Sequence, residues 1–147
     1  MAGVSQRITV DDARAQRAFA ELARRAVDQA PAWDEIGSML VAGTIRRFEL
    51  GVAPDGTAWR PSLRAREEGG RTLVDTGRLM GSITHVAGAD FVDVGSNVVY
   101  AAIHQLGGPT GRGHVVDMPA RPYLGVDAGE AVEIGNILAD YLGGAVR

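Results

Sequence analysis

The segment 32–50 constrains the fold most, because its apolar residues are spread too widely for an ordinary surface helix. Pro31 is typical of the first turn of a helix, and the segment that follows contains no further proline. At 100° per residue, large apolar side chains cover more than half of the circumference: Trp33, Ile36, Met39, Leu40, Val41, Ile45 and Phe48. A surface helix needs an apolar stripe of roughly 100°. The pattern therefore predicts either a central helix covered within its own fold or a helix that also contacts another subunit.

A narrower polar strip runs along the same segment and predicts which side of the helix faces water. It consists of Glu35, Ser38, Ala42, Arg46 and Glu49.

The signals around this helix predict a single domain over residues 1–147, of the α+β class, with long helices packed on a small antiparallel sheet. Twenty glycines, about twice the usual share, indicate long glycine-rich loops. We expect two loops, at about 60–72 and 107–117, to be irregular and flexible. The other expected elements are a strand at 6–10, a helix at 13–29 capped by Asp11 or Asp12, a hairpin of strands 82–86 and 91–95, a short helix at 100–106 and a last helix at 127–142.

The first and last helices have amphipathic patterns. In the first, a stripe of Ala15, Phe19, Leu22 and Ala26 lies opposite an arginine-rich face in which Glu21 stands four residues from Arg17 and from Arg25. This face is interpreted as solvated surface, with phosphate contact as the alternative. In the last helix, the predicted apolar side consists of Ala128, Val132, Leu138, Ala139 and Leu142.

Composition excludes several classes of protein. The net charge is −3 and all fifteen basic residues are arginine, which gives no overall electrostatic case for nucleic acid as a partner. The absence of cysteine excludes disulfides and thiolate metal sites. No apolar run has the length of a signal peptide core or a membrane span, so no membrane partner is expected.

The stretch YAAIHQLGGPTGRGHVVDMPARPYLG, residues 100–125, has the residue types of an active site but lacks the arrangements that catalysis requires. The three histidines have no metal-binding helical spacing, and a site built from His104, His114 and Asp117 is less favoured than structural or interface roles. No serine stands in a G-x-S-x-G context, and the glycine loop lacks the strand, helix and lysine of a phosphate loop. We expect no enzyme activity, no cofactor and no metal.

Four blocks of sequence resemble the phage virion morphogenesis family, the tail-completion proteins of Mu-like and related tailed phages. The blocks occur in the order FELGVAPDGTAW, LVDTGRLMGSI, YAAIHQLGG and MPARPYLG, and with the segments between them they cover roughly residues 36–142. The resemblance implies a structural protein of the head–tail junction of the virion, assembled in the cytoplasm of the bacterial host. It implies a ring of identical subunits, commonly six, that contacts the connector, other neck proteins and the tail tube. Genomic DNA would pass through the ring without sequence-specific binding.

The same blocks supply the residues expected to make interactions or hold structure. Tyr100 is expected to pack the short helix onto the hairpin, and His104 and Gln105 to hydrogen-bond the turn that closes it. Gly107 and Gly108 should end this helix and release a loop that orders on assembly. The full set is Trp59, Thr76, Gly77, Leu79, Tyr100, His104, Gln105, Gly107, Gly108, Arg121, Pro122 and Tyr123.

A small nucleic-acid-binding module is the alternative function. It would use the arginines of the first helix and those of the two loops, which are Arg64, Arg66, Arg71 and Arg112. Most of these loop arginines are expected to pair with acidic neighbours rather than to face DNA, because strong phosphate contacts would hold DNA that has to slide.

Overall fold

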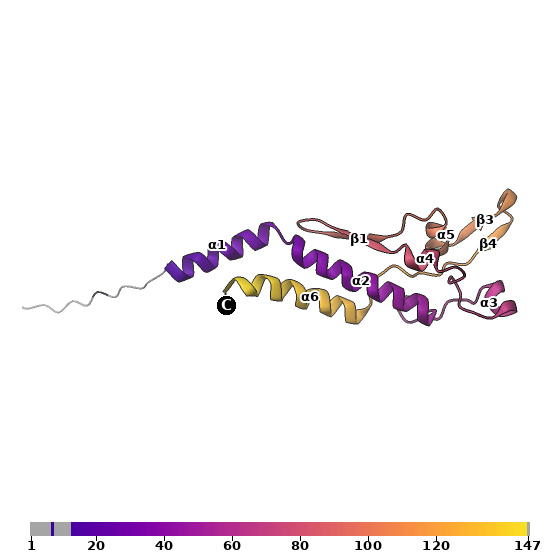
Figure 1. Ribbon diagram of the computed structural model, residues 1–147, viewed down its shortest axis with the longest axis horizontal. Coiled ribbons are helices and arrows are strands. Elements are labelled where there is room, and N and C mark those ends of the chain that lie inside the picture. The colour runs from indigo at the N-terminus through magenta and orange to yellow at the C-terminus, as the bar shows by residue number, and fades with distance from the viewer. Residues whose placement is uncertain (1–6, 8–12, 147) are drawn as a thin grey trace, which may run out of the picture.

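The computed structural model describes residue 7 and residues 13–146. The strand predicted at 6–10 lies outside the described residues except for Arg7, which has no regular structure, and so do the predicted caps Asp11 and Asp12. The described part forms an elongated α+β molecule (Figure 1), as the sequence predicts.

Helix α2 (Ala30–Leu50) is the axis of the molecule, which confirms the prediction of a central helix. The β1–β2 hairpin packs on one side of it, and helix α6 (Ala128–Gly143) lies along the other (Figure 1). Its five predicted polar-strip residues are all exposed. Its buried residues include one charged side chain and are Ala32, Ile36, Gly37, Leu40, Thr44, Arg47 and Phe48.

The β1–β2 hairpin is antiparallel, as predicted, with β1 at Thr84–Ala87 and β2 at Val92–Gly95. Gly37 of α2 is the point where it approaches most closely. A Cβ atom at this position would lie 2.3 Å from His85 Cδ2 and 2.8 Å from Val92 Cγ2. His85 Nε2 and Asp34 Oδ1 are 2.8 Å apart, which adds a polar contact beside the apolar one.

The buried apolar residues form two cores, one at each end of α2. The α6 core lies between α2 and α6 and consists of Ala32, Ile36, Leu40 and Ile137, with partly buried residues such as Trp33 and Tyr141 around it. The distal core lies around the C-terminal end of α2. It consists of Phe48, Ala53, Trp59, Leu79, Ile83, Val98, Ala101 and Tyr123.

Both segments predicted to be irregular contain regular structure, so that part of the prediction is wrong. In 60–72, helix α3 (Leu63–Glu68) begins where the Ser62 hydroxyl accepts a hydrogen bond from Ala65 N at 3.2 Å. The whole of this helix falls in the predicted loop because the segment is rich in charged residues, but arginine, glutamate, alanine and leucine are good helix formers. In 107–117, a second antiparallel hairpin joins β3 (Gly108–Thr110) to β4 (Val116–Met118), through the turn η1 (Arg112–His114).

Helix α1 (Ala13–Val27) buries none of its residues, and its predicted apolar stripe is largely exposed. Phe19 is 68% exposed. The helix is held through Arg25, which donates to Tyr141 O at 2.7 Å and lies 5.3 Å from the Tyr141 ring. Glu21 binds Arg24 and Arg25 rather than Arg17, and these hydrogen bonds lower the pKa of its carboxyl group to about 2.

The apolar side predicted for the last helix is wrong in part, since only some of its residues, Leu138 among them, pack on α2. The helix itself and its start are confirmed. Val132 is 65% exposed, and Ala128 and Ala139 are exposed as well. The side that packs on α2 contains Ile134, Ile137, Leu138 and Tyr141. No helix in the described part of the chain is long and apolar enough to span a membrane.

Gly37→Ala is expected to destabilise the protein by about 1–3 kcal/mol, because the hairpin must move away from α2 to make room for the methyl group. The measurement is the free energy of unfolding in urea.

Gly135→Ala is the matched control, since a Cβ atom at Gly135 in α6 meets nothing within 4 Å. This substitution should raise stability by up to about 1 kcal/mol through helix propensity alone. Equal effects of the two substitutions would contradict the role given to Gly37.

Candidate functional site

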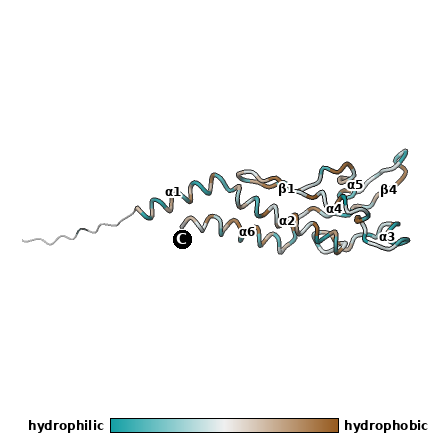
Figure 2. The backbone as a smooth tube through the Cα atoms, in the orientation of Figure 1, coloured by the Kyte–Doolittle hydropathy of each residue, from teal (hydrophilic) through white to brown (hydrophobic). Residues whose placement is uncertain are grey.

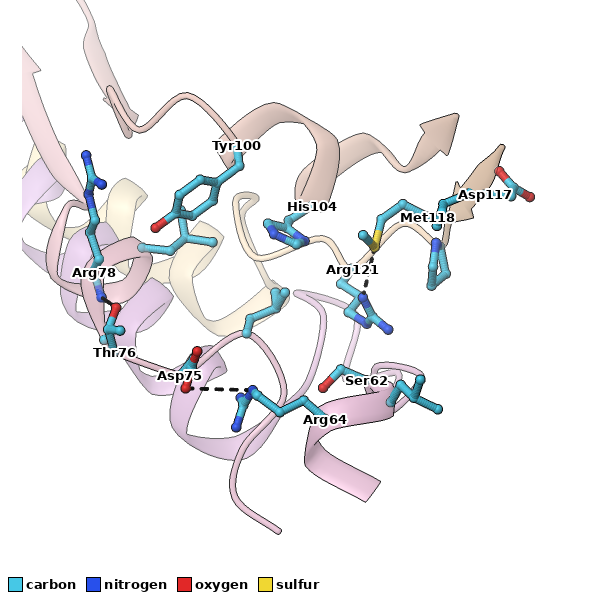
Figure 3. Close-up of a pocket in the computed structure, with 16 residues that line it drawn as sticks. Ser62, Arg64, Asp75, Thr76, Arg78, Tyr100, His104, Asp117, Met118 and Arg121 are labelled. Carbon is cyan, nitrogen blue, oxygen red and sulfur yellow. Dashed lines mark hydrogen bonds and ion pairs between the residues drawn. The ribbon is translucent and has the colours of Figure 1, made fainter. Parts of the chain in front are cut away.

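Three of the four sequence blocks meet at a cleft of about 590 Å³ near the end of the molecule opposite α1 (Figures 1 and 3). The cleft is lined by α3, the segment 73–79 that leads into helix α4 (Arg78–Gly81), helix α5 (Ala101–Leu106) and the chain from β4 to Arg121. Six of the twelve predicted residues line it: Thr76, Gly77, Leu79, Tyr100, His104 and Arg121.

Figure 3 shows Tyr100, His104 and Arg121 in a row along one side of the cleft, with Thr76, Asp75 and Arg64 across from them. The Arg64 guanidinium lies 3.8 Å from Asp75 and also donates to the carbonyl oxygens of Arg71 and Val74. These bonds tie the α3 segment to the turn at 71–75. The predicted residues Thr76 and Tyr100 face each other across the cleft (Figure 3). The wall on the side of Thr76 is held together by the bonds of Arg64.

Gln105 was predicted to hydrogen-bond the turn that closes its own helix. Its side chain instead bonds to the chain segment behind the cleft. Its Oε1 accepts hydrogen bonds from the main-chain N–H groups of Tyr123 and Leu124, both at 3.0 Å, and its Nε2 donates to Leu124 O at 3.1 Å. This side chain therefore holds the segment 123–124 against α5 and so fixes the position of Arg121 beside it.

Trp59, Pro122 and Tyr123 do not line the cleft; Trp59 and Tyr123 belong to the core that also contains the lining residue Leu79. Trp59 Nε1 donates to Pro122 O at 2.8 Å, and the Tyr123 hydroxyl donates to Ala101 O at 2.6 Å. Both rings contact Phe48, with centroid distances of 5.6 Å for Trp59 and 5.0 Å for Tyr123. Burial raises the pKa of the Tyr123 hydroxyl. These contacts place Trp59 and Tyr123 in the distal core.

Gly107 ends α5 as predicted, but the chain then continues into β3 instead of a free loop. Its φ is +69°, and a Cβ atom would lie 2.6 Å from Ala120 N and 2.7 Å from Met118 O. Because both atoms belong to the main chain, they have little freedom to move aside. Gly107 therefore lets the two polypeptide segments that flank the cleft pass close together, with Gly108 forming the first residue of β3.

Arg121 is a buried cation with neutral partners only. Its Nε donates to Arg60 O at 2.7 Å, and its Nη1 lies 3.5 Å from the sulfur of Met118. No aspartate or glutamate in the described part of the chain forms an ion pair with it. Burial lowers its pKa, and the charge of Arg60 lowers it further. The part of the cleft beside Arg121 therefore carries positive charge that the described residues leave uncompensated.

His104 lies between Tyr100 and Arg121, and its main chain and its imidazole ring make different contacts. Its main-chain carbonyl accepts a hydrogen bond from Arg121 N at 2.8 Å. The ring makes an edge contact with Tyr100 at a centroid distance of 5.9 Å, and its Nδ1 is buried without a hydrogen-bond partner. The predicted bond to the helix turn is therefore made by the main chain and not by the imidazole. Burial lowers the pKa of the ring, and the charge of Arg121 adds to this.

Among the described residues, the cleft shows neither the oriented imidazole of an acid–base site nor a cluster of metal ligands. The imidazole of His104 has no carboxylate to orient it, and the Ser62 hydroxyl is engaged in capping α3. Within the described residues, no group of three His, Asp or Glu side chains could hold a metal ion. His104 and Asp117 both line the cleft, but His114 does not.

The sequence did not point to Arg47 and Glu130, which hold the segment 123–125 behind the cleft in place. Arg47 Nη1 donates to Tyr123 O at 3.1 Å and to Gly125 O at 3.2 Å, while Nη2 binds the Glu130 carboxylate. A signal for Arg47 was present, because on the α2 wheel it falls between Ile36 and Leu40, within the apolar part. An arginine at such a position has to find partners inside the fold.

Comparison with known proteins gives consistent matches. The profile of a family described as the phage virion morphogenesis family matches residues 10–143. The chain is 38% identical over 124 residues to Mu-like prophage FluMu G protein 2 of Haemophilus influenzae, covering 84% of this chain and 86% of that protein. It is 34% identical over 150 aligned positions to protein G of Escherichia phage Mu, provisionally named a capsid assembly protein, covering 95% and 96%. No solved structure matches the chain.

The lowered pKa of His104 predicts a specific loss of stability in acid. Below the usual histidine value of about 6.5, the unfolded chain binds a proton that the folded protein does not, so stability falls as the pH drops from there toward the lowered pKa. His104→Gln should flatten this dependence. The measurement is urea unfolding at pH 7.5 and pH 5.5 on both proteins, which differ at residue 104 alone. An unchanged pH dependence in the variant would contradict the prediction.

Proposed function

Since the chain belongs to the phage virion morphogenesis family, we propose that it completes the tail and joins the tail tube to the head connector. In this proposal it acts as a structural part of the neck, without catalysis. The observation that carries it is the convergence of the sequence blocks on one cleft that offers binding surface and lacks a catalytic arrangement.

The distribution of exposed apolar residues supports an assembling subunit. Around the cleft, Leu63, Val99, Leu106 and Val116 are exposed, and Figure 2 shows hydrophobic chain at α5 and β4. Near the other end, Phe19 and Val27 of α1 are exposed. Two different apolar surfaces are what a head-to-tail contact requires, and a head-to-tail contact that closes produces a ring. We therefore propose a ring of identical subunits, with six as the expected number, through which genomic DNA passes.

The proposed neck role predicts the defect that loss of the protein causes. Deleting the gene from the phage or prophage that encodes this chain should abolish infectious particles and leave filled heads and tails that are not joined. Tyr100→Ala and Arg121→Ala, supplied in trans, should fail to restore joining, because both alter the cleft. The measurements are infectious titre and electron microscopy of lysates, with circular dichroism to verify folding.

Arg46→Ala is the matched control for Arg121→Ala, because Arg46 is an exposed arginine on the polar strip of α2. It should restore joining fully. Infectious particles from the deletion would disprove the proposal, and aberrant or empty capsids with normal tails would favour a role in capsid assembly instead. Normal joining by well-folded Tyr100→Ala and Arg121→Ala proteins would remove these two residues from the mechanism.

Weak binding to duplex DNA is a further expectation, and it separates the proposal from a nucleic-acid-binding module. Arg24, Arg25 and Arg64 already contact acidic side chains, which reduces the charge available to phosphates. A module with six to ten phosphate contacts would lose about 10³–10⁵ in affinity between 50 and 200 mM salt. We expect little binding even at 50 mM, measured by fluorescence anisotropy. Tight, steeply salt-dependent binding would favour the alternative.

A further inference from the structure

The charges that face the cleft do not balance in the part beside Arg121. Arg121 is buried there with Arg60 nearby, and its hydrogen bonds go to a carbonyl oxygen and a thioether sulfur. Two carboxylates line the cleft, but Asp75 pairs with Arg64 and Asp117 points away from Arg121 (Figure 3). A buried cation is costly unless it is paired, so this position favours a carboxylate supplied from outside.

His104 provides a second unsatisfied polar group beside Arg121. Its Nδ1 is buried and makes no hydrogen bond, although the imidazole lies in the wall of the cleft. Buried polar atoms in folded proteins nearly always have partners, and an exception calls for an explanation. An occupant of the cleft that presents a polar atom near Arg121 can bond to this nitrogen once the imidazole turns toward the cleft.

The remaining wall of the cleft is mainly apolar and is contributed by side chains such as Leu63, Leu73, Leu79, Tyr100 and Val116. Leu63 and Val116 stand at its edges and are largely exposed. Such a wall suits the apolar side chains on either side of an acidic residue in a polypeptide. It is less suited to a nucleic-acid backbone, which presents phosphates and sugars, and no apolar side chains, to such a wall.

We propose that the cleft receives a segment of a partner protein in which an aspartate or glutamate, flanked by apolar residues, pairs with Arg121 and contacts His104 Nδ1. This inference rests on the proposed function in that a neck protein needs such contacts with its neighbours. It identifies the chemistry of the partner segment, which that function leaves open.

The test uses the isolated full-length protein, so its result does not depend on particle assembly. The probe is the peptide N-acetyl-Leu-Glu-Leu-amide, with N-acetyl-Leu-Gln-Leu-amide as the neutral match, titrated into ¹⁵N-labelled protein and followed by NMR. We expect the glutamate peptide to bind at least about tenfold more tightly, which is the effect of one charge-assisted hydrogen bond. The shifted signals should include Arg121 Nε–H and the amides of Tyr100 and His104.

Variants of the cleft and of the surface show whether Arg121 is the source of the preference. Arg121→Gln should remove the preference for glutamate over glutamine, and Arg46→Gln, on the exposed strip of α2, should leave it intact. If Arg121→Gln fails to fold, the peptide pair on the unaltered protein and the His104→Leu variant decide the question. His104→Leu should weaken binding of the glutamate peptide severalfold.

Equal binding of the two peptides, or shifts confined to another surface, would overturn the inference. A folded Arg121→Gln variant that keeps the preference would do the same. Inorganic phosphate is the third arm, and shifts at Arg121 as large as those caused by the glutamate peptide would indicate a phosphate site instead. If peptide binding fails while Arg121→Ala still blocks joining in the phage, the proposed function stands and only the chemistry of the partner segment is wrong.

Discussion

The part of the molecule around the distal core depends on the hydrogen bonds and ion pairs that the buried guanidinium of Arg47 makes. It binds the carbonyl oxygens of Tyr123 and Gly125 and the carboxylate of Glu130, and lies 3.7 Å from Asp127. Asp127 and Glu130 form the capping box of α6, with Asp127 N bonded to Glu130 at 2.9 Å and Glu130 N bonded to Asp127 at 2.7 Å. One cation thus joins the end of α2, the start of α6 and the segment behind the cleft. Loss of one partner from such a buried pair typically costs about 3–5 kcal/mol, because the other charge stays behind unpaired.

This arrangement explains how a small protein can hold a cleft on segments with little regular structure. The chain from Pro119 to Leu124 has no helix or strand, yet its backbone groups are bonded to Arg47, Gln105, Trp59 and the His104 carbonyl. Side chains replace the ladder of hydrogen bonds that a sheet would supply, and they satisfy main-chain groups that burial would otherwise leave without partners. Arg121 is held in place by its neighbours in sequence, so its own side chain is available to face the cleft.

The sequence predicted those parts of the structure in which large apolar residues dominate. The wide apolar surface of α2 and its polar strip predicted a central helix, because seven large side chains leave few ways to orient it. The β1–β2 hairpin, the end of α5 at Gly107 and the packing of Trp59 also followed from local patterns. The six predicted residues that line the cleft were identified through the family resemblance, and only the fold could bring them together.

The predictions that failed rested on weaker patterns. The predicted stripe of α1 consists of alanines with Phe19 and Leu22, and burying alanine contributes too little free energy to determine how a helix is oriented. In α6, Ile134, Ile137 and Tyr141 determine which side packs on α2, because together they bury more apolar area than Val132 would. The β3–β4 hairpin has strands of three residues, too short for an alternating pattern. The hydrogen-bond partners of Arg47 lie at least 76 residues away in the sequence, and those of Gln105 at least 18. Both separations are beyond the range of any local signal.

The division of the interior into two cores has a spectroscopic consequence. The chain contains two tryptophans, and one belongs to each core: Trp33 packs beside the α6 core, and Trp59 lies in the distal core. Replacing either ring leaves a fluorophore that reports on one end of the molecule alone. Since α2 runs continuously through both ends, the two signals reveal whether this single helix transmits a disturbance at the cleft to the end where α1 and α6 meet.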